Sequence, residues 1–369
     1  MQRKDIFPAT TLFSGIPPSI ARIVILCFIG LAVYGILLGD FENTLPAGSG
    51  GGEDLRAYRH IAERVRDGEG YYEAAHRELQ PLYPTGSLFD WRLPYLGWTI
   101  GHMPDPLVAQ GLGVILALLT LLLWFVLAQD SLPFPMMAAG SLLLIGAPAY
   151  SFVSDLFLAH EFWAGTLITL SILAYARGWL MASLVAAVLA LMVRELSLLY
   201  VAVMLALSFR ERKVQEALHW LTVIVLFAGL MAVHFTHVRE YAGGGIGGVQ
   251  PWITLGGWKF VLATCSMHPY LIFLPQWLTA VVVPLAVVGL MGWRGPLGSR
   301  IGATVCVYMT AFMIIGQSFN RYWGVLYVNL LPLGLLFAPA AVRDLFYSAA
   351  TIPTGASVAA VKECKKTAV

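Results

Sequence analysis

The chain has 369 residues, of which 58% are apolar and only 12% are charged, and its mean hydropathy is +0.74. Soluble domains are about 45–50% apolar and about 25% charged, so this composition excludes a water-soluble globule and equally a disordered or fibrous chain. The formal net charge of +2 is too balanced to suggest a nucleic-acid-binding protein. The sequence predicts an all-α polytopic membrane protein.

Apolar runs long enough for about ten transmembrane helices follow one another along the chain, at roughly 20 residues per span. We expect spans at 20–39, 106–128, 133–153, 160–176, 179–194, 195–209, 217–237, 270–292, 301–318 and 323–341. The first run follows Arg3 and Lys4 and has no small-residue cleavage site at its end. It is therefore expected to be a retained helix and not a cleaved signal.

The stretch 179–209 is either one long tilted helix or two short passes that meet at Arg194–Glu195. With two passes and a cytoplasmic N-terminus, every short cytoplasmic connection except 129–132 carries a cation, as the positive-inside rule requires. A single helix would instead put the basic stretch 210–213 and the lysine-rich tail outside. We therefore expect two passes, both termini in the cytoplasm, and a multi-pass protein of the plasma (inner) membrane.

With this topology most of the acidic residues fall on the extracytoplasmic face, so we expect any chemistry to occur there. No phosphate-binding or dinucleotide-binding fingerprint is visible. His234 and His237 are spaced as metal ligands can be, but the sequence places no third ligand beside them. The four cysteines show neither a metal-binding nor a disulfide pattern. We expect no metal and no cofactor.

Residues 40–105 form the longest polar segment and the first extracytoplasmic loop. After a glycine-rich stretch, apolar residues recur at helical spacing: Leu55, Tyr58, Ile61, Ala62 and Val65. This pattern predicts an amphipathic helix that lies along the membrane surface, with Asp54 in its first turn and Gly68 at its end. Taken alone, Asp54 could simply be a helix cap.

The segment 79–98 is rich in aromatic residues and prolines, and Arg92 lies among them. We do not expect a regular helix there. The segment could wall a groove in which aromatic faces meet sugar rings and lipid headgroups, or it could be an interfacial aromatic belt. A second extracytoplasmic loop, 238–269, contains a glycine-rich stretch that could be a mobile flap. A short interfacial or re-entrant helix with Lys259 and His268 follows at 256–270.

Several charged and polar side chains lie at the extracytoplasmic ends of the expected spans: Asp155, His160, Glu161, Arg194, Glu195 and Arg321. Charges this close to hydrocarbon are costly and usually line a cavity. The alternative is mutual pairing that holds helices together, for example Arg194 with Glu161 or Asp155.

Three segments on this face resemble the GT-C superfamily of integral-membrane glycosyltransferases, which take a sugar from a polyprenyl-phosphate carrier. The first segment comprises Asp54, Tyr58, Ala62, Gly68 and Tyr71, the second is 89–94, and the third is 320–332. The many-helix layout with a long first loop extends the resemblance over most of the chain. The order Glu53–Asp54 departs from the doubled Asp-Glu order of some branches, and a large C-terminal soluble domain is lacking.

The resemblance implies that Asp54 is the catalytic aspartate of the first loop and that Arg321 contacts the carrier phosphate. The leaving phosphate is already a stable anion, so a single general base is sufficient, unlike the carboxylate pair of glycoside hydrolases. We expect Arg194 to assist Arg321, and transfer of a hexosyl or pentosyl group with inversion. The remaining substrate-binding candidates are Tyr58, Arg92, Asp155, His160, Glu161, Glu195, Tyr322 and His268. Which of Asp155 and Glu161 is the second acidic group stays open.

The expected partners are a polyprenyl-phosphate-linked sugar donor, a glycan, lipid or protein acceptor, and membrane lipids. Two other functions remain as alternatives. A lipid-linked glycan polymerase or ligase would also use arginines and histidines on the outer face, but it would not be expected to need a first-loop aspartate. A lipid or solute transporter would explain charges at membrane depth, but such folds often contain inverted repeats, and none is visible.

Overall fold

The computed structural model describes residues 10–41, 52–82, 88–129, 132–146, 154–242 and 253–350, except for the side chains of 154 and 155. Within these ranges the chain is all-helical, as the composition predicted, and the one strand-like contact is an isolated antiparallel bridge between Ile253 and Ile315. The glycine-rich stretches at 47–51 and 243–248 lie outside the described residues.

The longer helices are α1 (Pro18–Leu37), α5 (Pro106–Ala128), α8 (His160–Arg177), α11 (Val214–Tyr241) and α14 (Gly295–Ile314). The shorter helices are α2 (Gly52–Arg66), α3 (Tyr71–Leu79), α4 (Pro94–Gly101), α6 (Phe134–Leu144), α9 (Leu180–Val193), α10 (Leu198–Arg210), α12 (Gly257–Cys265), α13 (Gln276–Gly292) and α15 (Ala338–Ala350). Short 3-10 segments are η2 (Leu88–Asp90), η4 (Ser154–Leu158), η5 (Glu195–Ser197), η6 (Leu271–Phe273), η7 (Ser318–Leu326) and η8 (Leu331–Leu336).

Four of the described helices, α1, α5, α11 and α14, are long and apolar enough to cross a membrane, and α6, α9 and α13 are shorter apolar helices. Helix α1 exposes large apolar side chains such as Ile23, Leu26 and Leu37, which suits a surface that faces lipid and not water. These helices are those of a membrane protein, although fewer of them reach spanning length than the ten that the apolar runs predicted.

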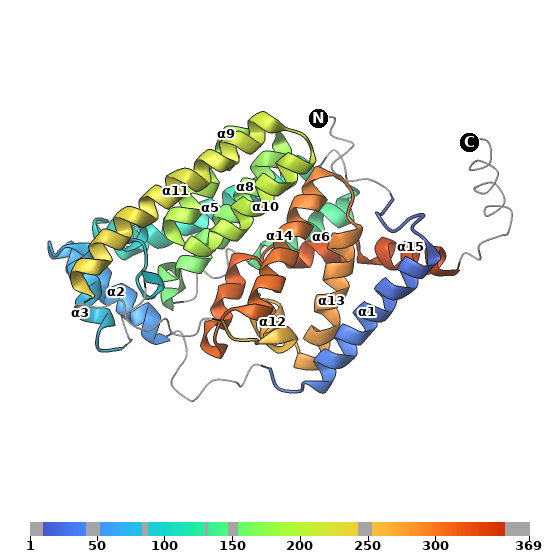
Figure 1. Ribbon diagram of the computed structural model, residues 1–369, viewed down its shortest axis with the longest axis horizontal. Helices are drawn as coiled ribbons and strands as arrows, with labels where there is room; N and C mark the ends of the chain where they lie inside the picture. The colour runs from blue at the N-terminus through green and yellow to red at the C-terminus, as the bar shows by residue number, and fades with distance from the viewer. Residues whose placement is uncertain are drawn as a thin grey trace, which may run out of the picture.

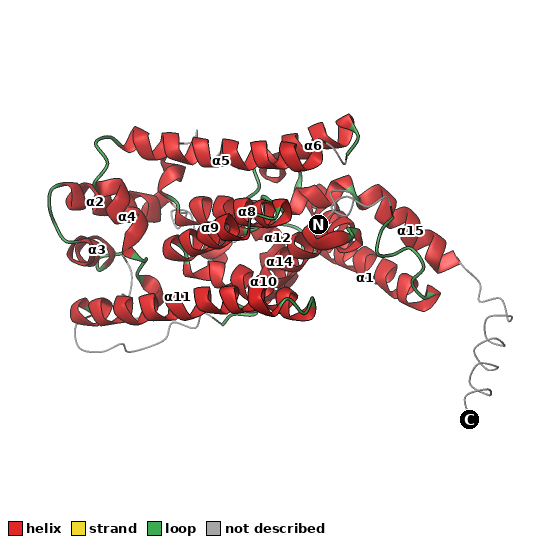
Figure 2. Ribbon diagram, turned by 90° about the horizontal axis from the view of Figure 1, so that it is seen from above, coloured by secondary structure: helices red, strands yellow, loops and turns green. Residues whose placement is uncertain are grey.

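The helices form three layers. Helices α5 and α6 make one outer layer and α11 the other, with α8, α9, α10, α12 and α14 between them (Figure 2). Helices α2, α3 and α4 gather at one end of the molecule, and α1 and α15 lie at the other (Figures 1 and 2). The end that carries α2–α4 is called the first-loop end below.

The chain reverses between α9 and α10, as expected for two short passes. Arg194 has extended backbone angles (φ −146°, ψ 116°), so α9 stops at Val193. Arg194 pairs with Glu161 at the start of α8, whereas Glu211 after the end of α10 shares Arg300 with Tyr175 near the end of α8. Helix α10 therefore runs in the direction of α8, and α9 runs against both.

The tenth expected span, 323–341, is wrong as a helix. The chain there forms the two 3-10 segments η7 and η8, and a regular helix begins only at Ala338. Pro332 and two glycines interrupt the segment, and nearly every side chain from Trp323 to Gly334 is buried. A long apolar run shows burial but does not distinguish a straight span from an irregular core segment.

Close backbone contacts explain why this segment leaves the helical path. A Cβ on Gly165 of α8 would collide with the carbonyl oxygen of Val325, and one on Gly324 would collide with the carbonyl oxygen of Thr264 in α12. Both approaches are possible only for glycine. The segment is thus held between α8 and α12, and this packing brings its first residues beside the start of α8.

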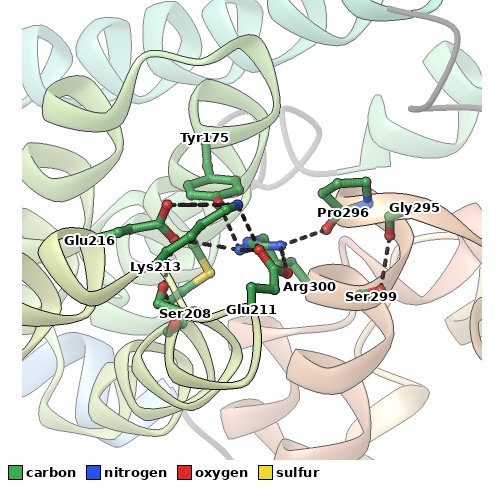
Figure 3. A network of polar contacts seen from close by, with 10 residues as sticks. Tyr175, Ser208, Glu211, Lys213, Glu216, Gly295, Pro296, Ser299 and Arg300 are labelled. Carbon is green, nitrogen blue, oxygen red and sulfur yellow. Dashed lines mark hydrogen bonds and ion pairs between the residues drawn. The ribbon is translucent and has the colours of Figure 1, made fainter. Parts of the chain in front are cut away.

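A polar network fastens the end of the bundle away from the first-loop end (Figure 3). Arg300 of α14 is fully buried; it donates to both oxygens of Glu211 at 2.9 and 3.1 Å and to the Tyr175 hydroxyl at 2.6 Å. Its guanidinium carbon lies 3.9 Å from the centre of the Tyr175 ring. Lys213 also donates to the Tyr175 hydroxyl, and that hydroxyl donates to Glu216. The network joins α8, α14 and the α10–α11 turn.

Candidate active site

Helix α2 forms where the periodicity predicted it and places Asp54 in its first turn. Its buried face comprises Ala57, Ile61, Ala62 and Val65, and the helix ends just before Gly68, whose φ of +94° lies in the left-handed region. Glycine adopts this region without a steric penalty, so it ends the helix cleanly. The buried face packs against α4 and α3 and thereby fixes the direction in which the first turn points.

A pocket of about 260 Å³ lies between α2, the start of α8 and the start of η7. Its polar lining comes from widely separated parts of the sequence: Asp54, Tyr58, Glu161, Arg321 and Tyr322. The rest of the lining includes Leu55, Leu156, Phe162, Met267, Phe319 and Val325. The pocket therefore combines two carboxylates and one guanidinium with an apolar wall.

Of the sequence-predicted residues, Asp54 and Arg321 share this pocket, although 267 positions separate them (321 − 54). Each of them also has a polar or electrostatic partner in the structure. Glu161 is the acidic residue of α8 that lines the same pocket. The side chain of Asp155 lies outside the described residues, so only Glu161 is placed.

Arg194 and Glu195 lie in a second layer, behind the pocket lining. Arg194 is 1% exposed, and its Nε lies 2.7 Å from Glu161 Oε1 while its Nη1 lies 2.6 Å from Glu195 Oε1. Its guanidinium carbon is 5.7 Å from the centre of the Trp323 ring. Arg194 is thus held by two carboxylates and a ring. This is the ion-pairing alternative considered from the sequence, and it leaves Arg321 as the guanidinium that lines the pocket.

His160 and Arg92 lie near Tyr58 and are not among the residues that line the pocket. The His160 ring meets the Tyr58 ring edge to face at 4.7 Å and is 3% exposed. Among the described residues no hydrogen-bond partner reaches either ring nitrogen of His160 or the Arg92 Nε. Burial raises the pKa of the Tyr58 hydroxyl well above its usual 10.0, against the opposing effect of Arg92, so this phenol stays protonated and can donate a hydrogen bond.

The aromatic segment 79–98 is more regular than expected. Residues 83–87 lie outside the described ranges, η2 follows, and α4 then begins at Pro94. The expectation that no regular helix forms there was wrong for its last part, because proline fits the first turn of a helix, where its missing N–H is not needed. The Arg92 carbonyl accepts a hydrogen bond from the Tyr71 hydroxyl at 2.9 Å, which ties this segment to α3.

His268 is not brought to the pocket. A short helix does form at α12, as expected, but His268 follows it as a fully buried side chain that packs against Gly146 after α6. Its Nδ1 accepts from the backbone N–H of Tyr270 at 3.2 Å. The neighbouring Met267 lines the pocket instead.

His234 and His237 face α3. His234 Nδ1 lies 2.8 Å from the Tyr72 hydroxyl, and the His237 ring stacks on Tyr72 at 4.8 Å. Within the described ranges, no group of three or more His, Cys, Asp or Glu side chains is arranged to hold a metal ion. The two histidines connect α11 to the first-loop helices.

Sequence reasoning missed two features of these sites. Trp323 provides the ring beneath Arg194, and its position directly after Tyr322 could have suggested a role. The network around Arg300 was also missed, because cations on that side were interpreted as membrane anchors. Arg300 borders the expected apolar span 301–318, and Glu211 and Glu216 lie in the connection between the expected spans 195–209 and 217–237. This combination was a usable signal for buried pairing.

The pocket can hold a ligand that is anionic at one point and apolar elsewhere. Arg321 suits a phosphate, because a guanidinium donates two parallel hydrogen bonds. Asp54 can accept a proton or a hydrogen bond from a hydroxyl. Comparison of the chain with protein-family models, with curated proteins and with solved structures found no match.

Proposed function

We propose that this protein is a membrane glycosyltransferase that moves a sugar from a polyprenyl-phosphate carrier to an acceptor hydroxyl. The observation that carries the proposal is the shared pocket of Asp54 and Arg321. Such a transfer requires at least one general base and one residue that binds the phosphate, and the pocket brings Asp54 and Arg321 together from distant parts of the sequence. The GT-C-like order of the sequence segments supports the same function.

In the proposed reaction, Asp54 takes the proton of the acceptor hydroxyl as its oxygen attacks the anomeric carbon. The bond between that carbon and the phosphate oxygen breaks, and its electron pair leaves with the polyprenyl phosphate. Arg321 offsets the phosphate charge. A single in-line displacement inverts the anomeric configuration. General-base assistance of this kind contributes about 10²–10⁴-fold to the rate.

The surroundings of the two residues fit this division of roles. Leu156, Phe162 and Val325 give the pocket an apolar wall on which the first isoprene units could lie. Arg321 lines the pocket and Arg194 does not, so we assign the phosphate to Arg321 and give Arg194, which is paired with two glutamates, the role of positioning Glu161. The apolar helices support a site at a membrane surface, which we propose to be the extracytoplasmic one.

The test is transfer from a panel of labelled polyprenyl-phosphate hexoses and pentoses by the detergent-solubilised protein. Asp54→Asn should lower kcat by 10²-fold or more, whereas Arg321→Gln should mainly raise the KM for the donor. Glu53→Gln is the matched control, because Glu53 is the exposed neighbour of Asp54 and does not line the pocket. Activity of Asp54→Asn within a few-fold of the parent would remove Asp54 from the role of base.

A further inference from the structure

The carboxylate of Glu161 is built into the pocket wall in an unusual way. Its side chain is only 3% exposed, yet it lines the pocket. One oxygen, Oε1, lies 2.7 Å from Arg194 Nε in an ion pair, but no hydrogen bond from the described residues reaches this buried oxygen. A buried carboxylate normally has its acceptor sites filled. Glu161 therefore offers an acceptor to whatever enters the pocket.

The supports of Glu161 keep this acceptor in place. Arg194 is itself held by Glu195 at 2.6 Å and by the Trp323 ring, and the chain on either side of it is pinned by α9 and by the hydrogen bond from Tyr308 to the Leu196 carbonyl. A carboxylate that is held in place by a buried guanidinium is a preorganised acceptor. Such an acceptor can orient a ligand without the entropy cost of first ordering its own side chain.

The groups next to Glu161 also lack partners. His160, its neighbour in α8, has two buried ring nitrogens that no described residue satisfies, and the Arg92 Nε is in the same condition. In a neutral imidazole, one nitrogen donates and the other accepts. Leaving such groups buried and unpaired is costly, so they are usually completed by a ligand or by water.

The charges decide which ligand fits. Behind this side of the pocket, the carboxylates of Glu161 and Glu195 are balanced by the guanidiniums of Arg194 and Arg92, so no excess positive charge is left for a phosphate. Hydroxyl groups both donate and accept and are neutral, so they match an acceptor carboxylate beside an imidazole. Arg321 is the cation that lines the pocket, and it can bind an anion. The pocket thus has one subsite for an anion and a different one for hydroxyls.

We infer that Glu161, supported by Arg194 and with His160 beside it, forms the subsite that binds the hydroxyl groups of a neutral sugar ring. The inference rests on the proposed function only for the statement that this sugar is the group transferred. In that case Glu161 is a specificity residue that selects which sugar the donor carries, and Asp54 performs the proton transfer.

Two simple probes separate the subsites in protein reconstituted without sugar-containing detergent. Octyl glucoside, octyl mannoside and octyl galactoside carry a neutral sugar without phosphate, and farnesyl phosphate carries a phosphate without sugar. Binding is measured by intrinsic tryptophan fluorescence. At least one octyl glycoside should bind the parent saturably. Glu161→Gln should weaken that binding about tenfold or more and change farnesyl phosphate binding by less than threefold. Arg321→Gln should do the reverse.

The matched control is Glu53→Gln, which alters an exposed carboxylate of α2 that does not line the pocket. Its glycoside affinity should stay within threefold of the parent, and thermal unfolding should show that both glutamate variants are folded. The inference is overturned if no octyl glycoside binds the parent, or if Glu161→Gln and Glu53→Gln weaken binding equally. Glycoside binding that follows this pattern in a protein without transfer activity would contradict only the proposed function.

Discussion

Two buried arginines at opposite ends of α8 make the same kinds of contact, but the carboxylates around them differ in how many hydrogen bonds they accept. Arg194 and Arg300 are 1% and 0% exposed, each pairs with two glutamates, and each lies over an aromatic ring. At the Arg300 end, every carboxylate oxygen of Glu211 and Glu216 accepts a hydrogen bond. At the Arg194 end, no hydrogen bond from the described residues reaches Glu161 Oε1, and Glu161 lines a pocket.

The difference teaches that residue type does not distinguish a structural clamp from a binding site. What distinguishes them is whether every donor and acceptor in the network already has a partner within the protein. A closed network fixes helices, and each additional partner would have to displace one already present. An incomplete network beside a cavity can bind a ligand, because the ligand supplies the hydrogen-bond partners that the protein does not provide.

The largest expected effect comes from breaking the closed network. Arg300→Gln leaves Glu211 and Glu216 without the buried guanidinium between them, and loss of one partner from a buried ion pair costs roughly 3–5 kcal/mol. We expect a marked fall in the thermal unfolding temperature in detergent, followed by circular dichroism. If stability does not change, Arg300 is not a clamp and the comparison of the two ends fails.

The close backbone contacts behind the pocket should give the next largest effect. Gly165→Ala would force a Cβ against the Val325 carbonyl, so we expect a loss of roughly 1–3 kcal/mol together with impaired transfer, because Val325 lines the pocket. Gly229→Ala in α11 is the control, since a Cβ there meets nothing within 4 Å. That substitution should be neutral or stabilise by about 0.5–1 kcal/mol. Equal losses in the two variants would contradict the packing described for η7.

The pH dependence of stability should come in part from the Arg300 end. Burial opposes the charged form, but hydrogen bonds from Arg300 and Lys213 lower the pKa of Glu211 from 4.5 to about 2. A carboxyl with a lowered folded-state pKa stabilises the fold fully above pH 4.5, and this stabilisation is lost as the pH falls toward 2. Unfolding temperatures between pH 6 and pH 3 should therefore fall less steeply for Glu211→Gln than for the parent. Parallel profiles would contradict this assignment.

The smallest effect is expected for an exposed pair at the first-loop end. Arg77 and Glu73 are one helical turn apart in α3, 2.7 Å from each other, and 53% and 45% exposed. Such pairs contribute about 0.5 kcal/mol or less. Glu73→Gln, which leaves the second pair of Arg77 with Glu69 intact, should barely shift the unfolding temperature, and a shift as large as that of Arg300→Gln would mean that burial is not what makes the Arg300 network strong.

Much of the first-loop end could be predicted from the sequence. The amphipathic periodicity predicted α2 and its end near Gly68, because an apolar face at helical spacing must find a surface to cover. Charge distribution predicted the reversal at Arg194. The expected tenth span, 323–341, could not be predicted correctly. Its apolar run does not show that glycines allow its backbone to contact α8 and α12 closely. Likewise, nothing local to His268 shows that it turns toward α6.

The sequence by itself predicted an all-helical protein with helices long and apolar enough to cross a membrane, because its apolar content is high and its charges are few. It also determined where α2 forms and where the chain must break. Only the tertiary structure decided that Asp54, Glu161 and Arg321 line one pocket while Arg194 stands behind it. Those positions depend on contacts between residues up to 267 positions apart (321 − 54), and such contacts follow from packing and not from local preference.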